Sequence, residues 1–450
     1  MATYRQLATN FGNGYAPFVA VTANCLFFFT GISLSWPSPV LVKLNGTDGN
    51  PLGNPISQEQ NDLIGSLFSI GGALGPILLI YALELLGRKS TMTILACIFP
   101  LFYLLLAFAE NIYLYYVSRI ATGIAAGGSI SIISIYVSEI VPVKYRGTYI
   151  ALGTCFILSG SFFSYCVGPY TSVMVFNIII ASLGFIYLPV FVFTCPETLY
   201  YTMQKYGPEK TMELLKILRK KSDLSEELKI IEGTVGKRET GKVLDLFKSR
   251  ASTKAFCICS TLMVVQEFSG INAIMTYSQT IFKNAEVSLA PAVCSIIVSA
   301  FQSSTSITTP LLSRKIKVKP LLMFSLSGIC FSHTLLILYF YVDYIHQFNW
   351  IPLVSLIGFV TFCNCGVASL PRVVLGEMYP LKVKAIGTAL TSIIYWFAQF
   401  LTTYYYNKID QAVAFLIFDV FCFCGIIFTY FFVIETKGRT FQEIQERLES

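Results

Sequence analysis

The sequence predicts an all-α membrane protein in which twelve transmembrane helices form two six-helix bundles. Hydrophobic residues make up 54% of the 450 residues and charged residues 13%, against about 25% charged residues in soluble domains. The apolar residues gather in runs long enough to cross a bilayer as helices, which needs about 20 residues. One charged stretch, 195–253, separates six such runs from six others. This composition excludes a disordered chain, a disulfide scaffold and an ordinary soluble enzyme.

We expect helices rather than strands, because an open strand in lipid leaves its backbone polar groups unpaired. The first half, 1–194, contains the apolar runs 15–36, 61–83, 91–109, 112–137, 148–168 and 172–193. The second half, 254–434, contains the runs 254–282, 291–312, 320–341, 350–374, 385–406 and 412–434. The bridge 195–253 carries segments, 209–221 and 225–232, that could form short amphipathic helices, and 435–450 forms a tail.

Lysine and arginine are concentrated on one side of this predicted membrane. Apart from the bridge, the loops and termini of that side carry fourteen Lys and Arg residues, whereas the opposite loops carry three. Because basic loops stay in the cytoplasm, we predict that the bridge and both termini are cytoplasmic, in a multi-pass protein of the plasma membrane. The predicted outer loop after the first run contains an Asn-Gly-Thr acceptor at Asn45, and glycosylation there would agree with this orientation.

The predicted inner loops of the two halves carry equivalent acidic and basic residues, which indicates an internal repeat. Such pairs could tie the halves together at the cytoplasmic side and separate when the cavity opens there, as in a rocking transporter. The alternative is that these charges only orient the loops and cap helices. The repeated residues are Arg88 and Arg314, Glu139 with Arg146 and Glu377 with Lys384, and Glu197 and Glu435.

Over nearly its whole length the chain resembles the sugar porter family of the major facilitator superfamily, and within it the insect facilitators for trehalose and hexoses. The resemblance rests on motifs in a fixed order: Gly72–Gly75 through Glu84 to Gly87-Arg88-Lys89, Arg119 with Gly123, Tyr136 to Gly147, Pro196-Glu197-Thr198, Gln266 to Asn272, Gly376 to Pro380, and Glu435 to Arg439. It implies a substrate site between the halves near the bilayer midplane. It also implies that Glu84 acts together with the repeated acidic and basic residues of the inner loops, and we call this set the cytoplasmic gate.

The expected site takes its main wall from the seventh run. Amide and hydroxyl groups that both donate and accept hydrogen bonds, together with an aromatic platform, suit a neutral polyol. Gln266, Asn272 and Tyr277 lie on this run, and the resemblance places Gln302 and Trp396 at the same site. Polar side chains that only join helices to each other are the alternative.

The chain departs from the family pattern at several site positions. Glu267 replaces a glutamine, Arg372 replaces the tryptophan that borders the sugar, Thr154 replaces a glutamine and Tyr395 an asparagine. A charge at membrane depth is costly, so we hypothesise that Glu267 and Arg372 form an ion pair across the seventh and tenth runs, within the substrate site. Alternatively, Arg372 reaches the inner interface or Glu267 faces water.

The predicted function is facilitated transport of a neutral polar solute, a hexose or trehalose, by alternating access. Proton-coupled symport is an alternative, because Glu267 and Asp419 could titrate, but the first run lacks the aspartate of proton-coupled relatives. A second alternative is a sugar sensor or scaffold that has the same fold but does not transport. Nothing indicates an enzyme, a metal or cofactor site, a nucleic-acid partner or an obligate protein partner, so the expected partners are a small sugar and the lipid bilayer.

Overall fold

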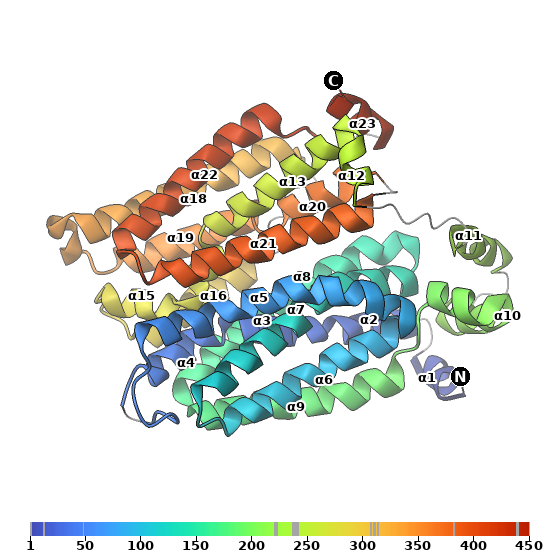
Figure 1. The fold of residues 1–450 in the computed structure, drawn as a ribbon, viewed down its shortest axis with the longest axis horizontal. Helices are drawn as coiled ribbons and strands as arrows, with labels where there is room; N and C mark the ends of the chain where they lie inside the picture. Colours follow the sequence, from blue (N-terminus) through green and yellow to red (C-terminus); the bar gives the residue numbers. More distant parts are fainter. Residues whose placement is uncertain are drawn as a thin grey trace.

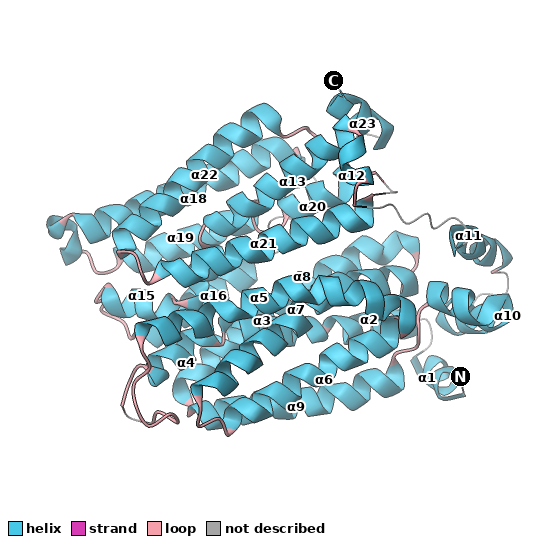
Figure 2. Ribbon diagram, viewed as in Figure 1, coloured by secondary structure: helices cyan, strands magenta, loops and turns pink. Residues whose placement is uncertain are grey.

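The computed structural model of this protein describes residues 2–11, 14–47, 49–219, 224–235, 243–306, 308, 312, 315–380, 383–437 and 441–449. Helices joined by short loops make up the described chain, and these ranges contain no strand (Figure 2). Two groups of long helices lie one above the other in Figure 1, the first half of the chain below and the second half above. The predicted all-α membrane fold is therefore confirmed.

The helices of the first half follow one another closely along the chain. They are α1 (Ala2–Phe11), α2 (Tyr15–Asn24), α3 (Leu26–Ser35), α4 (Pro37–Leu44), α5 (Gln58–Leu85), α6 (Arg88–Ala107), α7 (Ile112–Ile140), η2 (Val143–Tyr145), α8 (Arg146–Val167), η3 (Gly168–Tyr170) and α9 (Val173–Thr194).

The described part of the bridge is helical, and the second half follows it. The bridge contains α10 (Leu199–Arg219), α11 (Ser225–Val235) and α12 (Asp245–Lys248). The second half contains α13 (Arg250–Phe268), α14 (Ile271–Thr276), α15 (Ser278–Asn284), α16 (Pro291–Thr305), α18 (Val318–Tyr341), η4 (Asp343–Gln347), α19 (Ile351–Cys365), α20 (Leu370–Met378), α21 (Lys384–Tyr406) and α22 (Gln411–Phe432), and the tail contains α23 (Phe441–Glu449).

Eleven helical segments of the described chain are long and apolar enough to cross a membrane. The remaining predicted run, 291–312, is α16 followed by residues that lie partly outside the described ranges. Runs two to six, nine, eleven and twelve match helices within three residues at each end. The first run was predicted to end at residue 36, which is wrong, because the segment continues to Leu44. Pro37 does not stop it, since proline fits the first turn of a helix, where its missing N–H has no partner to lose.

Two predicted runs of the second half are broken where the backbone leaves the helical region, whereas α2, α3 and α4 of the first run are joined by residues with helical backbone angles. The seventh divides into α13, α14 and α15, and the tenth into α19 and α20 with residues 366–369 between them. At the first break Gly270 has a φ of +81°, which glycine adopts without the cost that other residues meet. Backbone breaks at membrane depth are tolerated where they are buried in protein or line a cavity, so both breaks mark the interior of the second half.

Glycines set the close packing of the first half. Gly71 and Gly75 of α5 face Gly123 and Gly127 of α7, and a Cβ atom on any of these four would overlap backbone atoms of the opposite helix. Small residues let membrane helices approach closely, where dispersion contacts replace the missing hydrophobic driving force. The glycine-rich stretch at 71–75 therefore serves helix packing.

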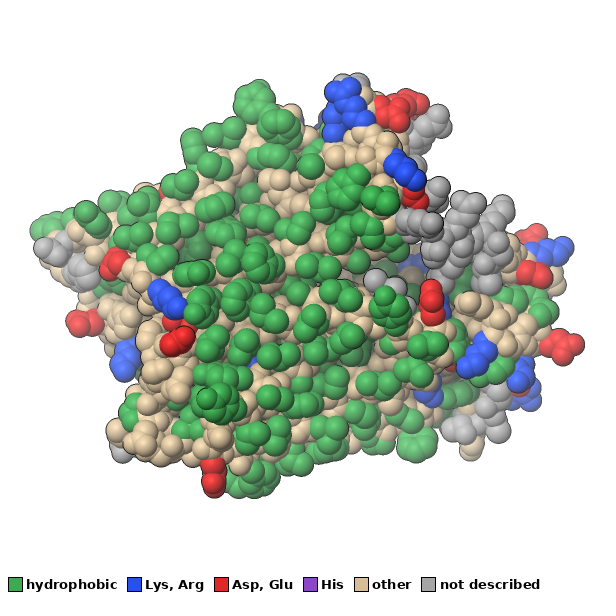
Figure 3. Space-filling view, viewed as in Figure 1, with side chains coloured by type: hydrophobic (Ala, Val, Ile, Leu, Met, Phe, Trp, Pro, Cys, Tyr) green, Lys and Arg blue, Asp and Glu red, His purple; other side chains and the backbone are tan. Residues whose placement is uncertain are grey.

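The surface agrees with a membrane environment. In Figure 3 apolar side chains cover the middle of the visible face, and charged side chains gather toward its two ends. The bridge helices α10 and α11, the tail helix α23 and both termini lie at one end of the molecule (Figure 1). We call this the linker end, and the opposite end, which carries α4 and α15, the far end.

The halves meet most closely toward the far end. Across the boundary α5 packs on α21, α4 on α15, α3 on α14 and α8 on α16. In Figure 1 the helices of the two halves diverge toward the linker end.

Candidate functional site

The expected site lies where α13 ends and α14 begins. Gly270 permits this break, and a Cβ atom there would lie 2.5 Å from the ring of Phe418, so the position requires glycine both for its backbone angle and for space. The last turn of α13 carries Gln266 and Glu267, and α14 carries Asn272 close to its first residue. Across the break the Asn272 amide meets the Glu267 carboxylate, while Gln266 bonds to Ala368.

Glu267 is fully buried at the end of α13, where its carboxylate faces Asn272. Asn272 Nδ2 lies 2.9 Å from both carboxylate oxygens of Glu267 and donates to them. Asn272 itself is half-buried, with the Tyr395 hydroxyl 3.4 Å from the same nitrogen. The interaction fixes the orientation of the Asn272 amide, because its nitrogen must face the carboxylate and its oxygen must point elsewhere.

Arg372 is exposed on α20 and points toward the middle of α21. Its Nη2 donates to the Tyr395 hydroxyl at 3.3 Å, and its guanidinium lies 5.4 Å from the centre of the Tyr395 ring. Tyr395 is the twelfth residue of the 23-residue α21, so Arg372 does not reach toward the inner interface.

The hypothesis of a direct Glu267–Arg372 ion pair is wrong for this structure. No ion pair within 4 Å joins them in the described chain, since Arg372 bonds to Tyr395 and Glu267 to Asn272. The two charges lie at opposite ends of a polar chain of side chains through Tyr395 and Asn272. The sequence showed Tyr395 only as a departure from the family pattern, although its hydroxyl beside Trp396 was a signal for a site residue.

Gln266 faces the second helix break. Its Nε2 donates to the Ala368 backbone oxygen at 3.4 Å. Its Oε1 and the Ser369 hydroxyl are buried without a protein hydrogen-bond partner among the described residues. Buried polar atoms are almost always satisfied by protein, water or ligand. These atoms can therefore accept and donate hydrogen bonds to a hydroxyl-rich molecule or to water.

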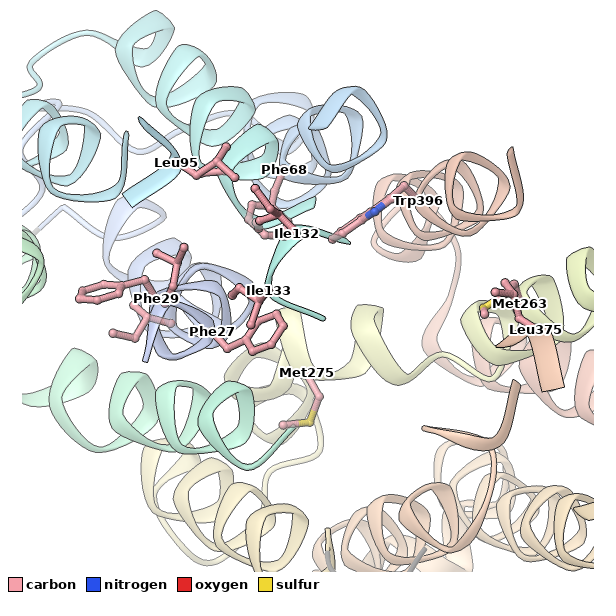
Figure 4. Packing of buried hydrophobic residues seen from close by; sticks show 14 of the residues in the cluster. Phe27, Phe29, Phe68, Leu95, Ile132, Ile133, Met263, Met275, Leu375 and Trp396 are labelled. Atoms are coloured by element: carbon pink, nitrogen blue, oxygen red, sulfur yellow. The ribbon is translucent and has the colours of Figure 1, made fainter. Parts of the chain in front are cut away.

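Trp396 and Tyr277 lie at contacts between the halves. Figure 4 shows Trp396 extending from α21 toward Phe68 of α5, and the two ring centres are 5.9 Å apart. Tyr277 is buried, stacks on Tyr406 at 5.5 Å, and lies against Gly65 of α5. Both side chains thus depend on the first half for part of their burial.

Gln302 and Thr154 are not joined to this cluster by a hydrogen bond in the described structure. Gln302 is buried on α16, where its backbone oxygen accepts a hydrogen bond from Asn364. Thr154 is exposed on α8. These helices pack on each other across the boundary between the halves, so both residues lie near that boundary.

Two acidic residues of the predicted gate, Glu197 and Glu435, cap helices in equivalent places of the two halves. Glu197 accepts hydrogen bonds from the backbone N–H groups of Arg88 and Lys89, at the N-terminus of α6. Glu435 does the same for Val318 and Lys319 of α18. A carboxylate at a helix N-terminus satisfies free N–H groups and complements the helix dipole. The repeat expected from the sequence is therefore present as a pair of matching caps.

Four further gate residues, Arg88, Glu139, Arg146 and Lys384, bond within their own half in this structure. Arg88 and Glu139 form a buried ion pair at 3.3 Å, Arg146 Nε lies 3.5 Å from the Val141 oxygen, and Lys384 donates to the Gly376 oxygen. Glu84 and Glu377 are exposed, and Arg314 lies outside the described residues. The residues for a latch between the halves are thus present at the linker end, while each of these three contacts joins partners of the same half.

Asn45, the predicted glycosylation site, is exposed at the end of α4. Its Nδ2 donates to Asn61 Oδ1 at 3.1 Å. The acceptor lies at the far end, opposite the basic bridge.

Comparison with known proteins gives a consistent result. The family described as Sugar (and other) transporter matches residues 6–448. The chain is 28% identical to the facilitated trehalose transporter Tret1 of Polypedilum vanderplanki, over 93% of this chain and 85% of that protein. It is 28% identical to the sugar transporter ERD6-like 7 of Arabidopsis thaliana, over 95% and 92% of the two chains. The inward-open xylose transporter XylE from E. coli has the same fold, with a TM-score of 0.82, 18% identity, and coverage of 96% of this chain and 100% of that one.

Proposed function

The chain belongs to the Sugar (and other) transporter family, and from this premise we propose that it equilibrates a neutral sugar, a hexose or trehalose, across the plasma membrane. The observation that supports this most is the family match over nearly the whole chain, joined with a polar cluster at the helix breaks between two membrane-embedded halves. Named relatives that are facilitated trehalose transporters favour that disaccharide as the first substrate to test.

The transport step is a rocking of the two halves about the site. Gln266 and Asn272 present amide groups to the sugar hydroxyls, Tyr277 and Trp396 supply aromatic surface, and Gln302 and Thr154 extend the wall. Arg372 and Tyr395 face the same boundary from α20 and α21. The linker end faces the cytoplasm, as the distribution of Lys and Arg favours, and the structure corresponds to a state closed at the far end. When the cytoplasmic side closes, the gate residues exchange partners within each half for partners across the boundary.

Transport by this protein is expected to run down the sugar gradient without proton coupling. The buried Arg119 donates to the backbone oxygens of Ile64 and Ser33, at 2.9 and 2.7 Å, and its guanidinium lies over the ring of Phe68 at 4.7 Å. In the described chain Arg119 has no carboxylate within 4 Å. It therefore forms no ion pair that protonation of a carboxylate would break.

The test is uptake of labelled trehalose and glucose into liposomes containing the purified protein, with and without an imposed pH gradient. We expect the sugar to reach equal concentrations inside and outside, at rates that differ by less than about twofold between the two conditions, because no carboxylate is paired with Arg119. Accumulation driven by the pH gradient would contradict the facilitator and favour the symporter. A rise in melting temperature with sugar but no flux would favour a sugar sensor.

The proposed orientation predicts that Asn45 receives a glycan in a eukaryotic host. The variant Asn45→Gln should migrate as the enzymatically deglycosylated wild-type protein does, because the far end would face the lumen during synthesis. Asn54→Gln, which changes an exposed residue of the same loop outside the acceptor sequence, is the matched control and should keep the slower mobility. A wild-type protein whose mobility does not change on deglycosylation would leave Asn45 unmodified and remove this support for the orientation.

A further inference from the structure

A side-chain hydrogen bond closes the far end between the two halves. Asn407 Nδ2 donates to Asp62 Oδ1 at 3.1 Å, linking residues that are 345 positions apart in the sequence. Asp62 lies near the start of α5 and is fully buried, and Asn407 follows the last residue of α21. Gln58 Nε2 donates to the same oxygen from within α5, at 3.1 Å. We call Asp62 and Asn407 the far-end clasp.

The clasp belongs to one continuous antiparallel contact between α5 and α21. Ten residues after Asp62, Gly72 of α5 lies against Trp396 of α21, eleven residues before Asn407. At 1.5 Å per residue the two separations are about 15–17 Å, so the two helices stay in register from the clasp to Trp396. A movement that opens the far end must separate these helices and must break the clasp first.

Other links at the far end use backbone atoms. The Gln279 N–H donates to Ser38 Oγ at 3.3 Å, and the Tyr165 hydroxyl donates to the Met275 oxygen at 2.6 Å. The clasp differs because both of its partners are side chains. Substitution can therefore weaken this hydrogen bond, or move the carboxylate to position 407 and the amide to position 62. It also buries a carboxylate, whose Oδ2 has no protein hydrogen-bond partner in the described structure. Water can reach that oxygen once the far end opens, and this reduces the net stability that the closed clasp provides.

We propose that the Asp62–Asn407 clasp is the polar lock that holds the far end shut, and that it sets the balance between the two end states of the transport cycle. This inference rests on the alternating-access part of the proposed function, and it adds a lock on the side opposite the predicted cytoplasmic gate. A buried carboxylate requires its donor, so the loss of Asn407 destabilises only the state in which Asp62 is buried.

The experiment is hydrogen–deuterium exchange followed by mass spectrometry, on the full-length purified protein in lipid nanodiscs without sugar. Two far-end segments, α4 (Pro37–Leu44) and α15 (Ser278–Asn284), serve as reporters because they pack on each other and lie on neither clasp helix. Faster exchange in these reporters shows that the far end opens, whereas local loosening around residue 407 would leave them unchanged. A segment at the linker end, 143–150, reports the closing of the other side.

The decisive variants are Asn407→Asp and the double variant that exchanges the two side chains of the clasp. Asn407→Asp places two carboxylates against each other in a buried contact, and we expect at least about tenfold faster exchange in α4 and α15, with slower exchange in 143–150. The double variant Asp62→Asn/Asn407→Asp restores a carboxylate–amide pair and should return all three segments to within about twofold of the wild-type rates. Glu110→Gln, which removes an exposed carboxylate from the loop between α6 and α7 at the same end, should change nothing.

Asn407→Ala gives a second route if Asn407→Asp does not yield folded protein. It removes the donor without adding a charge and should also accelerate exchange in α4 and α15, by a smaller factor. Wild-type exchange in α4 and α15 for both variants would overturn the proposal, as would a double variant that exchanges as fast as Asn407→Asp. Because no sugar is present, these outcomes are independent of whether the protein transports trehalose or glucose.

Discussion

Replacing Asn272 by leucine is expected to destabilise the folded protein by about 2–3 kcal/mol, because hydrogen bonds to a buried charged group contribute that much. The change removes the amide that donates to both oxygens of the fully buried Glu267 in this structure. It also removes an amide from the proposed sugar site, so uptake should fall at least tenfold. The melting temperature of the purified protein and sugar uptake into liposomes measure the two effects separately.

Matched variants show how much of the lost folding stability comes from leaving the Glu267 carboxylate without Asn272. Glu267→Gln should be well tolerated, since a glutamine oxygen can still accept from Asn272 and no charge remains buried. The double variant Asn272→Leu/Glu267→Gln should recover about half of the lost stability without recovering uptake. Equal melting temperatures for Asn272→Leu and the double variant would contradict the view that Glu267 is the group Asn272 supports.

Replacing Gly127 by valine is expected to have the largest effect on folding. A Cβ atom on Gly127 would overlap the backbone oxygen of Gly72 on α5, and a backbone atom cannot move aside as the end of a side chain can. Overpacking costs about 1–3 kcal/mol and occasionally more. Because the side chain would meet backbone atoms, we expect at least a tenfold lower yield of monodisperse protein. Size-exclusion chromatography of a fluorescent fusion gives the yield.

Gly147→Val is the control, because no described atom lies within 4 Å of a Cβ atom at Gly147 on α8. It should express as the wild-type protein does. Similar yields for the two valine variants would show that the close approach of α5 and α7 is not what stabilises the first half.

Part of the fold was predictable because lipid imposes simple rules. Each span must be a helix of sufficient length with few charges, so most helix bounds follow directly from apolar runs, as in α6, α9 and α22. The first span extended beyond its predicted end because proline at 37 starts a new helical turn rather than stopping the segment.

The site was less predictable because it depends on where helices break. Gln266, Glu267 and Asn272 were named from their order along one predicted helix, but the break at Gly270 gives them different surroundings. Glu267 became a buried support for Asn272, and Arg372 bonded to Tyr395 instead of to Glu267. Charge alone favoured an ion pair, whereas the distances between side chains on separate helices decide which hydrogen bonds form.

The sequence by itself determined that this chain is a membrane protein of two repeated halves, because apolar length and repeated acidic residues are local properties of the chain. Only the tertiary structure decided that Glu197 and Glu435 cap helices within their own halves, that Trp396 packs against Gly72, and that Asp62 meets Asn407. Those pairings join residues far apart in the sequence, and they exist because helix packing brings particular turns of distant helices to the same depth.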